Sequence, residues 1–329
     1  MIKALKKVYD KLKKIYYDRL FMEYSDDLSA PSESEKILIT ELREEYTKIP
    51  VIDVTGLSGA ELNWSNNMNR LHELVLNDEP RRFLQWDVIG QTMAVGNVPY
   101  VLKEQKSLME SPLYNSIWRQ VITESEIGTP LKSRIIPNSS ANLVHLAYHL
   151  QQFTEKTAIS IDKLGFIFEF GGGYGAMCKL AFSLGFKKKY VIFDLPAFSS
   201  LQKYYLKAHG YKILTLDTFS KEETGVLCVS DLSELQTVID ISKAEKDKLF
   251  IATWSISETP LKLRSKIVPM LDDFTNFLIA YQNGFEEIDN VNYFKNFSEK
   301  YQNLKWLNWG IAHIPFNNYL VGSNKIVQK

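Results

Sequence analysis

The spacing of apolar residues along the chain changes from a helical to a strand-like pattern about halfway. In the first half, apolar positions recur every three or four residues in 32–49, 59–76 and 80–93, and a further helix is predicted from Ser139 or Ser140 to about Phe153. This spacing gives a helix one apolar face. From Leu164 onwards, short apolar runs alternate with helical stretches. We therefore predict a helical region over residues 1–155, which covers the substrate, and an α/β domain over 156–329.

The second half predicts a parallel sheet. Four apolar runs read as buried strands, at 164–170, 190–196, 248–254 and 276–283. Helical patterns follow the first two of them, at 176–185 and 198–208. Strands that alternate with helices in this way form a parallel sheet covered on both faces. Two last strand-like stretches, 304–309 and 318–322, are joined by a short loop and predict a terminal antiparallel hairpin.

A glycine-rich segment, GGGYG at 171–175, joins the first predicted strand to its helix. Glycine allows positive φ and lets the backbone approach a ligand closely. The helix that follows points free N–H groups at the same place. Asp194 ends the next strand and lies beside the same crevice, where an acid accepts hydrogen bonds from both ribose hydroxyls. The combination predicts a cofactor that contains a nucleoside.

Two nucleoside cofactors fit the turn. Gly171, Gly173 and Ala176 satisfy the looser dinucleotide pattern G-x-G-x-x-A. Glu169 favours S-adenosylmethionine instead, because a carboxylate two residues before Gly171 helps to position a cationic amino-acid tail, whereas pyrophosphate would be repelled. The terminal hairpin also fits a seven-stranded methyltransferase sheet better than a six-stranded dinucleotide sheet. A P-loop is excluded, since no G-K-[ST] follows the glycines.

The segments EFGGGYGAM and VIFDLPAFSSLQKYYL resemble motif I and the following Asp-Leu-Pro strand of class I S-adenosylmethionine-dependent methyltransferases. The wider pattern resembles the bacterial putative sugar O-methyltransferase family over roughly residues 79–322. The segments that carry it are EPRRFLQWDVIGQTM (79–93), EIGTP (126–130), LQKYYL (201–206), TWSISE (253–258), AYQNGFEEIDNVNYF (280–294) and AHIPFNNYLVG (312–322).

The resemblance implies a Rossmann-like seven-stranded methyltransferase domain. It also implies methyl transfer to a sugar hydroxyl in a surface glycan or its precursor. The implied cofactor residues are Glu169, Gly171, Gly172, Gly173, Tyr174, Gly175, Asp194 and Leu195. The acid that meets the adenine is left open between Asp217 and Asp231, with a slight preference for Asp231.

Methyl transfer needs an aligned acceptor oxygen and a base that removes its proton. In an open α/β sheet the ligand lies beyond the carboxyl ends of the strands. This rule selects His313, in the loop of the terminal hairpin, and Glu258, after the strand 248–254, as candidate catalytic groups. For each the alternative is a structural role, as a loop histidine or a first-turn acid of the next helix.

Three further polar residues, Gln282, Asn290 and Asn317, follow the same rule and are predicted to bind the substrate or to form turns. His145 and His149 share a helical face that favours contact with the roof of the site over a metal, and no metal site is predicted.

Two other functions remain open at this point. One is an NAD-dependent oxidoreductase built on the same glycine turn. The other is a protein with the methyltransferase fold that binds a ligand without catalysing a reaction. A site that has lost its activity would have no physical need for three glycines and a paired acid.

The charge balance is even, with 39 basic and 39 acidic residues, and gives no global reason to expect nucleic acid as a partner. Residues 1–21 are an exception, because they form a basic amphipathic pattern with a local excess of five positive charges. Such a helix lies on an anionic membrane or packs on the protein itself or on a second subunit. Two cysteines, no apolar stretch of membrane-spanning length and no secretory signal favour a cytoplasmic protein, peripheral at most to the inner face of the membrane.

Overall fold

The computed structural model describes residues 28–96, 98–133 and 138–327. The basic segment 1–21 lies outside them, so the predictions made for it are not addressed. Among the described residues no helix combines the length and apolarity that a membrane crossing needs.

Seven strands form one mixed sheet in the order β3-β2-β1-β4-β5-β9-β8. The strands are β1 (Phe166–Phe170), β2 (Lys189–Phe193), β3 (Gly225–Val229), β4 (Lys248–Thr253), β5 (Asn276–Gln282), β8 (Lys305–Gly310) and β9 (Asn317–Ser323). The first five run parallel, while β9 runs antiparallel to both β5 and β8. This confirms the predicted Rossmann-like seven-stranded fold with a terminal antiparallel hairpin.

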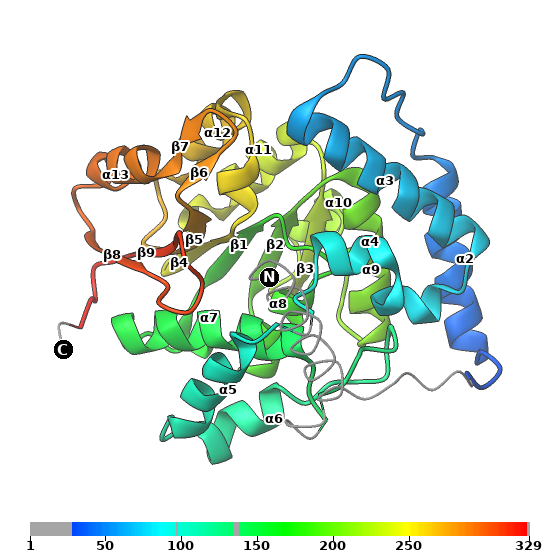
Figure 1. Cartoon of the computed structure of the whole chain (residues 1–329), viewed down its shortest axis with the longest axis horizontal. Helices are drawn as coiled ribbons and strands as arrows, with labels where there is room; N and C mark the ends of the chain where they lie inside the picture. Colours follow the sequence, from blue (N-terminus) through cyan, green and yellow to red (C-terminus); the bar gives the residue numbers. More distant parts are fainter. Residues whose placement is uncertain (1–27, 97, 134–137, 328–329) are drawn as a thin grey trace, which may run out of the picture.

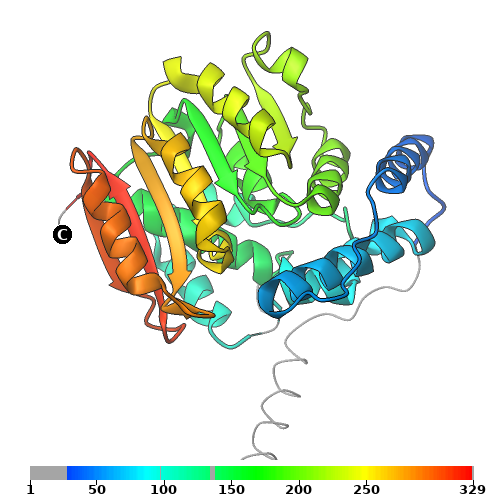
Figure 2. The same ribbon diagram turned by 90° about the horizontal axis from the view of Figure 1, so that it is seen from above.

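Helices cover both faces of the sheet (Figures 1 and 2). One face packs on α7 (Ala141–Thr157), α8 (Ala176–Ser183) and α9 (Pro196–Ala208), and the other on α11 (Leu232–Ile241), α12 (Leu261–Ile267) and α13 (Asn290–Lys300). The strand β1 shows how the sequence divides between them. Ile167 points into the first core, whereas Phe166, Phe168 and Phe170 point into the second, as the alternation of strand side chains requires.

The helical first half packs on the α7–α9 face. Its helices are α2 (Glu33–Thr47), α3 (Gly59–Asn77), α4 (Asp87–Thr92), α5 (Val101–Glu110) and α6 (Arg119–Val121). Their buried residues belong to the same apolar cluster as one face of the sheet. The predicted division at residue 155 therefore falls in the last turn of α7, within a shared core.

The single helix predicted over 80–93 was wrong. A 3-10 helix, Pro80–Gln85, is followed by α4, because the backbone of Trp86 between them is extended, with ψ 141°. The 3-10 helix begins at Pro80. A proline lacks the N–H that the interior of a longer helix would use, so it stands in the first turn.

Candidate active site

The carboxyl ends of the parallel strands form one edge of the sheet, and the predicted residues lie in the loops beyond it. The segment 171–175, here called the glycine turn, follows β1, and Asp194 follows β2. Trp254 and Ser255 follow β4. The loop between β8 and β9 reaches the same edge, because Asn317 at the start of β9 pairs with Gln282 at the end of β5.

The glycine turn has a backbone that other residues do not readily adopt. Gly171 and Gly173 have φ of 70° and 57°. A Cβ at Gly171 would collide with Ser255, and one at Gly173 would lie 3.3 Å from Cβ of Met93. Both positions are partly exposed. The turn therefore presents bare backbone toward the crevice, as close approach to a ligand requires.

Asp194 is held against the turn by three donors. The N–H of Gly173 and the side-chain amide of Gln202 donate to one carboxylate oxygen, at 3.2 and 2.9 Å, and the N–H of Leu195 donates to the other at 2.8 Å. Burial raises the pKa of Asp194 to about 7, although these donors act in the opposite direction. The Leu195 side chain beside it is 37% exposed. A carboxylate and an apolar surface thus lie side by side.

Glu169 lies beneath the turn, only 3% exposed. The Tyr190 hydroxyl donates to its carboxylate at 2.8 Å. Burial raises the pKa of Glu169 to about 8, since the Tyr190 bond offsets only part of the cost and Asp194 adds to it. The sheet edge therefore holds two acids whose ionisation is less favourable than in water.

Residues from the first half of the chain cover the glycine turn. The Asn142 side chain on α7 accepts a bond from the N–H of Val95 at 2.9 Å and donates to the Tyr174 hydroxyl at 2.8 Å. Tyr174 is 3% exposed, so its ring packs inward from the turn. These bonds fix the segment that carries Met93 over Gly173.

Asp231, and not Asp217, directly follows β3. Asp217 lies in the first turn of α10 (Leu216–Phe219). Asp231 is the N-cap of α11, where one of its carboxylate oxygens accepts the N–H groups of Ser233 and Glu234, at 2.8 and 3.1 Å. The Ser233 hydroxyl also donates to this oxygen, and that bond, together with the two from the backbone, lowers the pKa of Asp231. Its side chain is exposed at the strand end, and its part in binding adenine stays a prediction.

A buried polar cluster lies against the loops that follow β4 and β8. It consists of Glu104 on α5, His145 and His149 on α7, and His313 in the loop between β8 and β9, and we call it the histidine cluster. Glu104 contacts Nδ1 of His145 at 2.9 Å and Nε2 of His313 at 2.8 Å. The Nε2 atoms of His145 and His149 are 3.1 Å apart. Three predicted residues therefore meet, through a carboxylate that the sequence analysis did not single out.

Glu104 did carry a sequence signal. Val101, Glu104 and Leu108 recur at helical spacing on one face of α5, and all three are buried. An acid in an apolar stripe is costly unless it is hydrogen-bonded. It therefore marks a position with a partner elsewhere in the chain, although it does not identify that partner.

Trp254 connects the histidine cluster to the glycine turn. Its indole stacks on the His145 ring, with centroids 5.4 Å apart. Its φ is 64°, an uncommon backbone for a bulky residue, and such strain persists only where neighbours hold it in place. The indole N–H donates to the Asn317 side chain at 2.5 Å. The next residue, Ser255, donates its hydroxyl to the Phe170 carbonyl just before the turn.

The four other predicted residues brace the loops around this edge. Asn317 holds the Trp254 indole. Gln282 accepts the Ser257 hydroxyl at 2.6 Å and donates to Glu258 at 3.4 Å, and burial raises the pKa of Glu258. Asn290 is fully buried, and its side chain accepts a bond from Arg264 at 2.7 Å. Gln282 and Glu258 thus form a pair with each other, whereas the histidine cluster is centred on Glu104.

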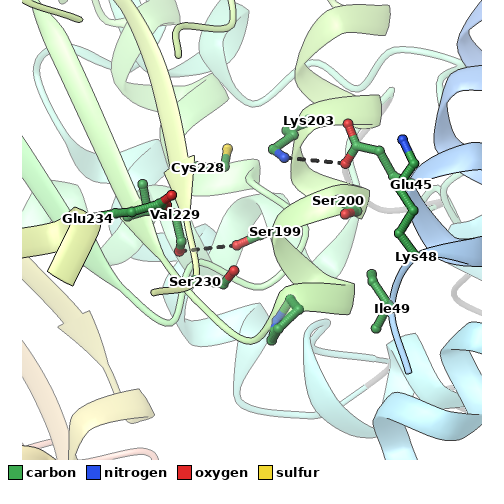
Figure 3. Close-up of a pocket in the computed structure, with 11 residues that line it drawn as sticks. Glu45, Lys48, Ile49, Ser199, Ser200, Lys203, Cys228, Val229, Ser230 and Glu234 are labelled. Atoms are coloured by element: carbon green, nitrogen blue, oxygen red, sulfur yellow. Dashed lines mark hydrogen bonds and ion pairs between the residues drawn. The ribbon is translucent and has the colours of Figure 1, made fainter. Parts of the chain in front are cut away.

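A cavity of about 260 Å³ lies between α2, α9 and the end of β3 (Figure 3). Glu45 and Lys48 of α2 face Ser199 and Lys203 of α9 across it, and Glu45 and Lys203 form an ion pair of 3.3 Å. Neither the glycine turn nor Asp194 lines this cavity. It therefore lies apart from the glycine turn and the histidine cluster.

The strand order and the antiparallel β9 are those expected of a class I methyltransferase fold. Solved structures similar to this chain include a fibrillarin pre-rRNA processing protein of Methanococcus jannaschii (10% identity, 51% of this chain and 70% of that one, TM-score 0.36). They also include TrmK of M. capricolum in complex with S-adenosylhomocysteine (12%, 54% and 67%, 0.33). A third is magnesium protoporphyrin IX methyltransferase of Synechocystis PCC 6803 with bound S-adenosylmethionine (8%, 68% and 96%, 0.36).

No family model matches the chain, and no curated protein matches it in sequence. The narrower resemblance to sugar O-methyltransferases thus stays a prediction. The prediction about partners was wrong, because it excluded nucleic acid: the similar structures include a pre-rRNA processing protein. Charges that balance over the whole chain do not exclude a local surface for such a partner.

Proposed function

We propose that this protein transfers a methyl group from S-adenosylmethionine to a hydroxyl oxygen of a sugar, in a surface glycan or its precursor. One observation carries the proposal. The glycine turn and the histidine cluster are joined by Trp254 and Ser255, so a site suited to a nucleoside cofactor and a set of proton-accepting groups lie at the same edge of the sheet.

The residues at the turn fit this cofactor. Asp194 offers carboxylate oxygens to ribose hydroxyls, and the exposed Leu195 offers an apolar surface to an adenine face. Gly171 and Gly173 have no space for a side chain, because a Cβ would meet Ser255 or Met93, and their positive φ keeps the turn as bare backbone. Glu169 and Asp194 favour a ligand with a cationic tail, whereas a pyrophosphate would bring a further anion to two acids. Asp231, at the end of β3, is the group we assign to the adenine amine.

When bound, S-adenosylmethionine supplies an electrophilic methyl group, whose bond to sulfur breaks, with the electron pair kept by sulfur, as a bond to the acceptor oxygen forms. The protein has to orient that oxygen and accept its proton. His313 is 8% exposed in its side chain and lies at the sheet edge, which suits it to this task. Glu258, paired with Gln282, is the second candidate base.

A sugar acceptor is supported by the rim of the crevice. Phe316 is 79% exposed and has a φ of 64°, so an aromatic ring is displayed on a strained loop. The Asn318 side chain donates to Asn283 at 2.6 Å, and Asn283 is also exposed. A flat apolar ring beside amides is suited to the C–H face and hydroxyls of a sugar. Gln282, Asn290 and Asn317 hold the loops that carry this rim.

The decisive test is calorimetric titration of the full chain with S-adenosylhomocysteine and, separately, with NAD. We expect one site for S-adenosylhomocysteine and no binding of NAD. Binding of NAD alone would assign the crevice to an oxidoreductase. A protein that binds S-adenosylhomocysteine but methylates none of a panel of sugars, sugar nucleotides and RNA would fit a binding protein without turnover.

A further inference from the structure

The hydrogen bonds of the histidine cluster converge on Glu104. The Tyr319 hydroxyl contacts Nδ1 of His149, whose Nε2 faces Nε2 of His145 at 3.1 Å. Nδ1 of His145 contacts the carboxylate of Glu104, and Nε2 of His313 contacts it from the other side. Glu104 thus stands between two imidazoles that come from different parts of the fold.

Counting protons fixes the role of each nitrogen. A carboxylate only accepts, so with Glu104 ionised both His145 and His313 donate to it. A neutral His145 then has a bare Nε2, which accepts a hydrogen bond from Nε2–H of His149. His149 in turn has a bare Nδ1 and accepts the Tyr319 hydroxyl. Among the imidazole nitrogens of the three histidines, only Nδ1 of His313 has no hydrogen bond with the described residues.

The surroundings favour this proton count. The His149 pKa lies well below its usual value, because burial and the neighbouring histidines disfavour its charged form, so His149 is neutral. The Tyr100 and Tyr148 rings lie 5.9 and 5.3 Å from that of His313, and their pKa values are raised to about 12 by burial and by Glu104. Both phenols therefore keep their own protons at neutral pH, and neither competes with His313 to accept one.

We propose that Glu104 is the positioning residue of the acceptor site. It holds His313 in the tautomer that carries its proton on Nε2, and thereby leaves the Nδ1 lone pair to accept the proton of the acceptor hydroxyl. No electrons are exchanged in this step, and the imidazolium that forms faces the Glu104 carboxylate. The inference rests on the proposed methyl transfer only for the identity of the group that His313 deprotonates.

The test is a long-range 15N–1H spectrum of the full chain labelled with 15N-histidine, at a pH where the imidazoles are neutral. We expect His313 to carry its proton on Nε2, and His145 to carry its proton on Nδ1. Glu104→Gln has one acceptor oxygen and one donor nitrogen in place of two acceptors. Nδ1 of His145 lies within 3.0 Å of both carboxylate oxygens, so in either orientation of the amide it faces the new donor nitrogen, and at least one of the two imidazoles should change tautomer. Glu110→Gln, on the same helix but exposed, is the matched control and should leave the spectrum unchanged.

A wild-type protein with the His313 proton on Nδ1, or a Glu104→Gln variant with both tautomers retained, would overturn the inference. The wild-type spectrum alone decides the first point, should the variant not fold. Turnover supplies a second readout: kcat of Glu104→Gln should fall about tenfold or more while affinity for S-adenosylhomocysteine stays within about twofold. If the wild type does not bind S-adenosylhomocysteine, the proposed function fails, but the tautomer result stands on its own.

Discussion

The two ends of the crevice are built in different ways. At the glycine turn, Glu169, Gly173 and Asp194 come from consecutive parts of one strand–helix–strand unit, and Gln202 on the next helix completes it. In the histidine cluster, Glu104 is separated from His145 by 41 residues and from His313 by 209. The first end depends on local backbone geometry, whereas the second depends on how the helical half docks on the sheet. Substitutions at the two ends should therefore affect different measurements.

The largest effect is expected at the histidine cluster. His313→Gln should lower kcat about 10²–10⁴-fold, because the acceptor proton then has no base, while affinity for S-adenosylhomocysteine is nearly unchanged. Glu258→Gln, measured on the same acceptor, should stay within about threefold. A large fall in Glu258→Gln alone would move the base to the Glu258–Gln282 pair and separate the histidine cluster from the chemistry.

The glycine turn should respond in binding. Gly173→Val places a branched side chain at a φ of 57° and against Met93, so the turn has to move. We expect affinity for S-adenosylhomocysteine to fall more than about 100-fold, or about 2.7 kcal/mol, with the circular dichroism spectrum retained. Gly90→Ala is the matched control, since nothing lies within 4 Å of its added Cβ. Equal affinity in both variants would remove the turn from the cofactor site.

Asp194 should matter less than the turn itself. Asp194→Ala removes a charged acceptor, and we expect a loss of about 1.5–3 kcal/mol in the binding of S-adenosylhomocysteine. Asp231→Ala should cost less than Asp194→Ala, because its exposed carboxylate makes an ordinary hydrogen bond at best. Calorimetry on both variants checks this order. A larger loss in Asp231→Ala would reverse the two roles.

The last effect concerns stability. The pKa of Glu169 is about 8 in the fold, above the usual 4.5, so its ionisation opposes folding increasingly as pH rises from 4.5 to 8. Glu169→Gln should therefore match the wild type in free energy of unfolding near pH 4 and exceed it by about 1–3 kcal/mol at pH 9. Denaturation with urea at the two pH values measures this. A difference that does not depend on pH would mean that Glu169 is not the titrating group.

The same contrast explains what the sequence could predict. The strands were recognisable because each is a short apolar run, and Asp194 and the turn because their spacing is local. The position of His313 at the sheet edge followed from the strand-end rule and the hairpin. Glu104 was not found, since an acid in an apolar stripe does not reveal a partner 209 residues away. The break at Trp86 was also missed, because the helical spacing continues across it.

The central claim is that both ends of the crevice serve one methyl transfer to a hydroxyl. Its most direct measurement is the fate of a labelled methyl group, with S-adenosylmethionine as donor and a panel of sugars, sugar nucleotides and RNA as acceptors. The account predicts label in a sugar as an alkali-stable ether, absent with His313→Gln and absent with Gly173→Val. Label on nitrogen or in an alkali-labile ester would contradict it, and label confined to RNA would contradict the proposed acceptor.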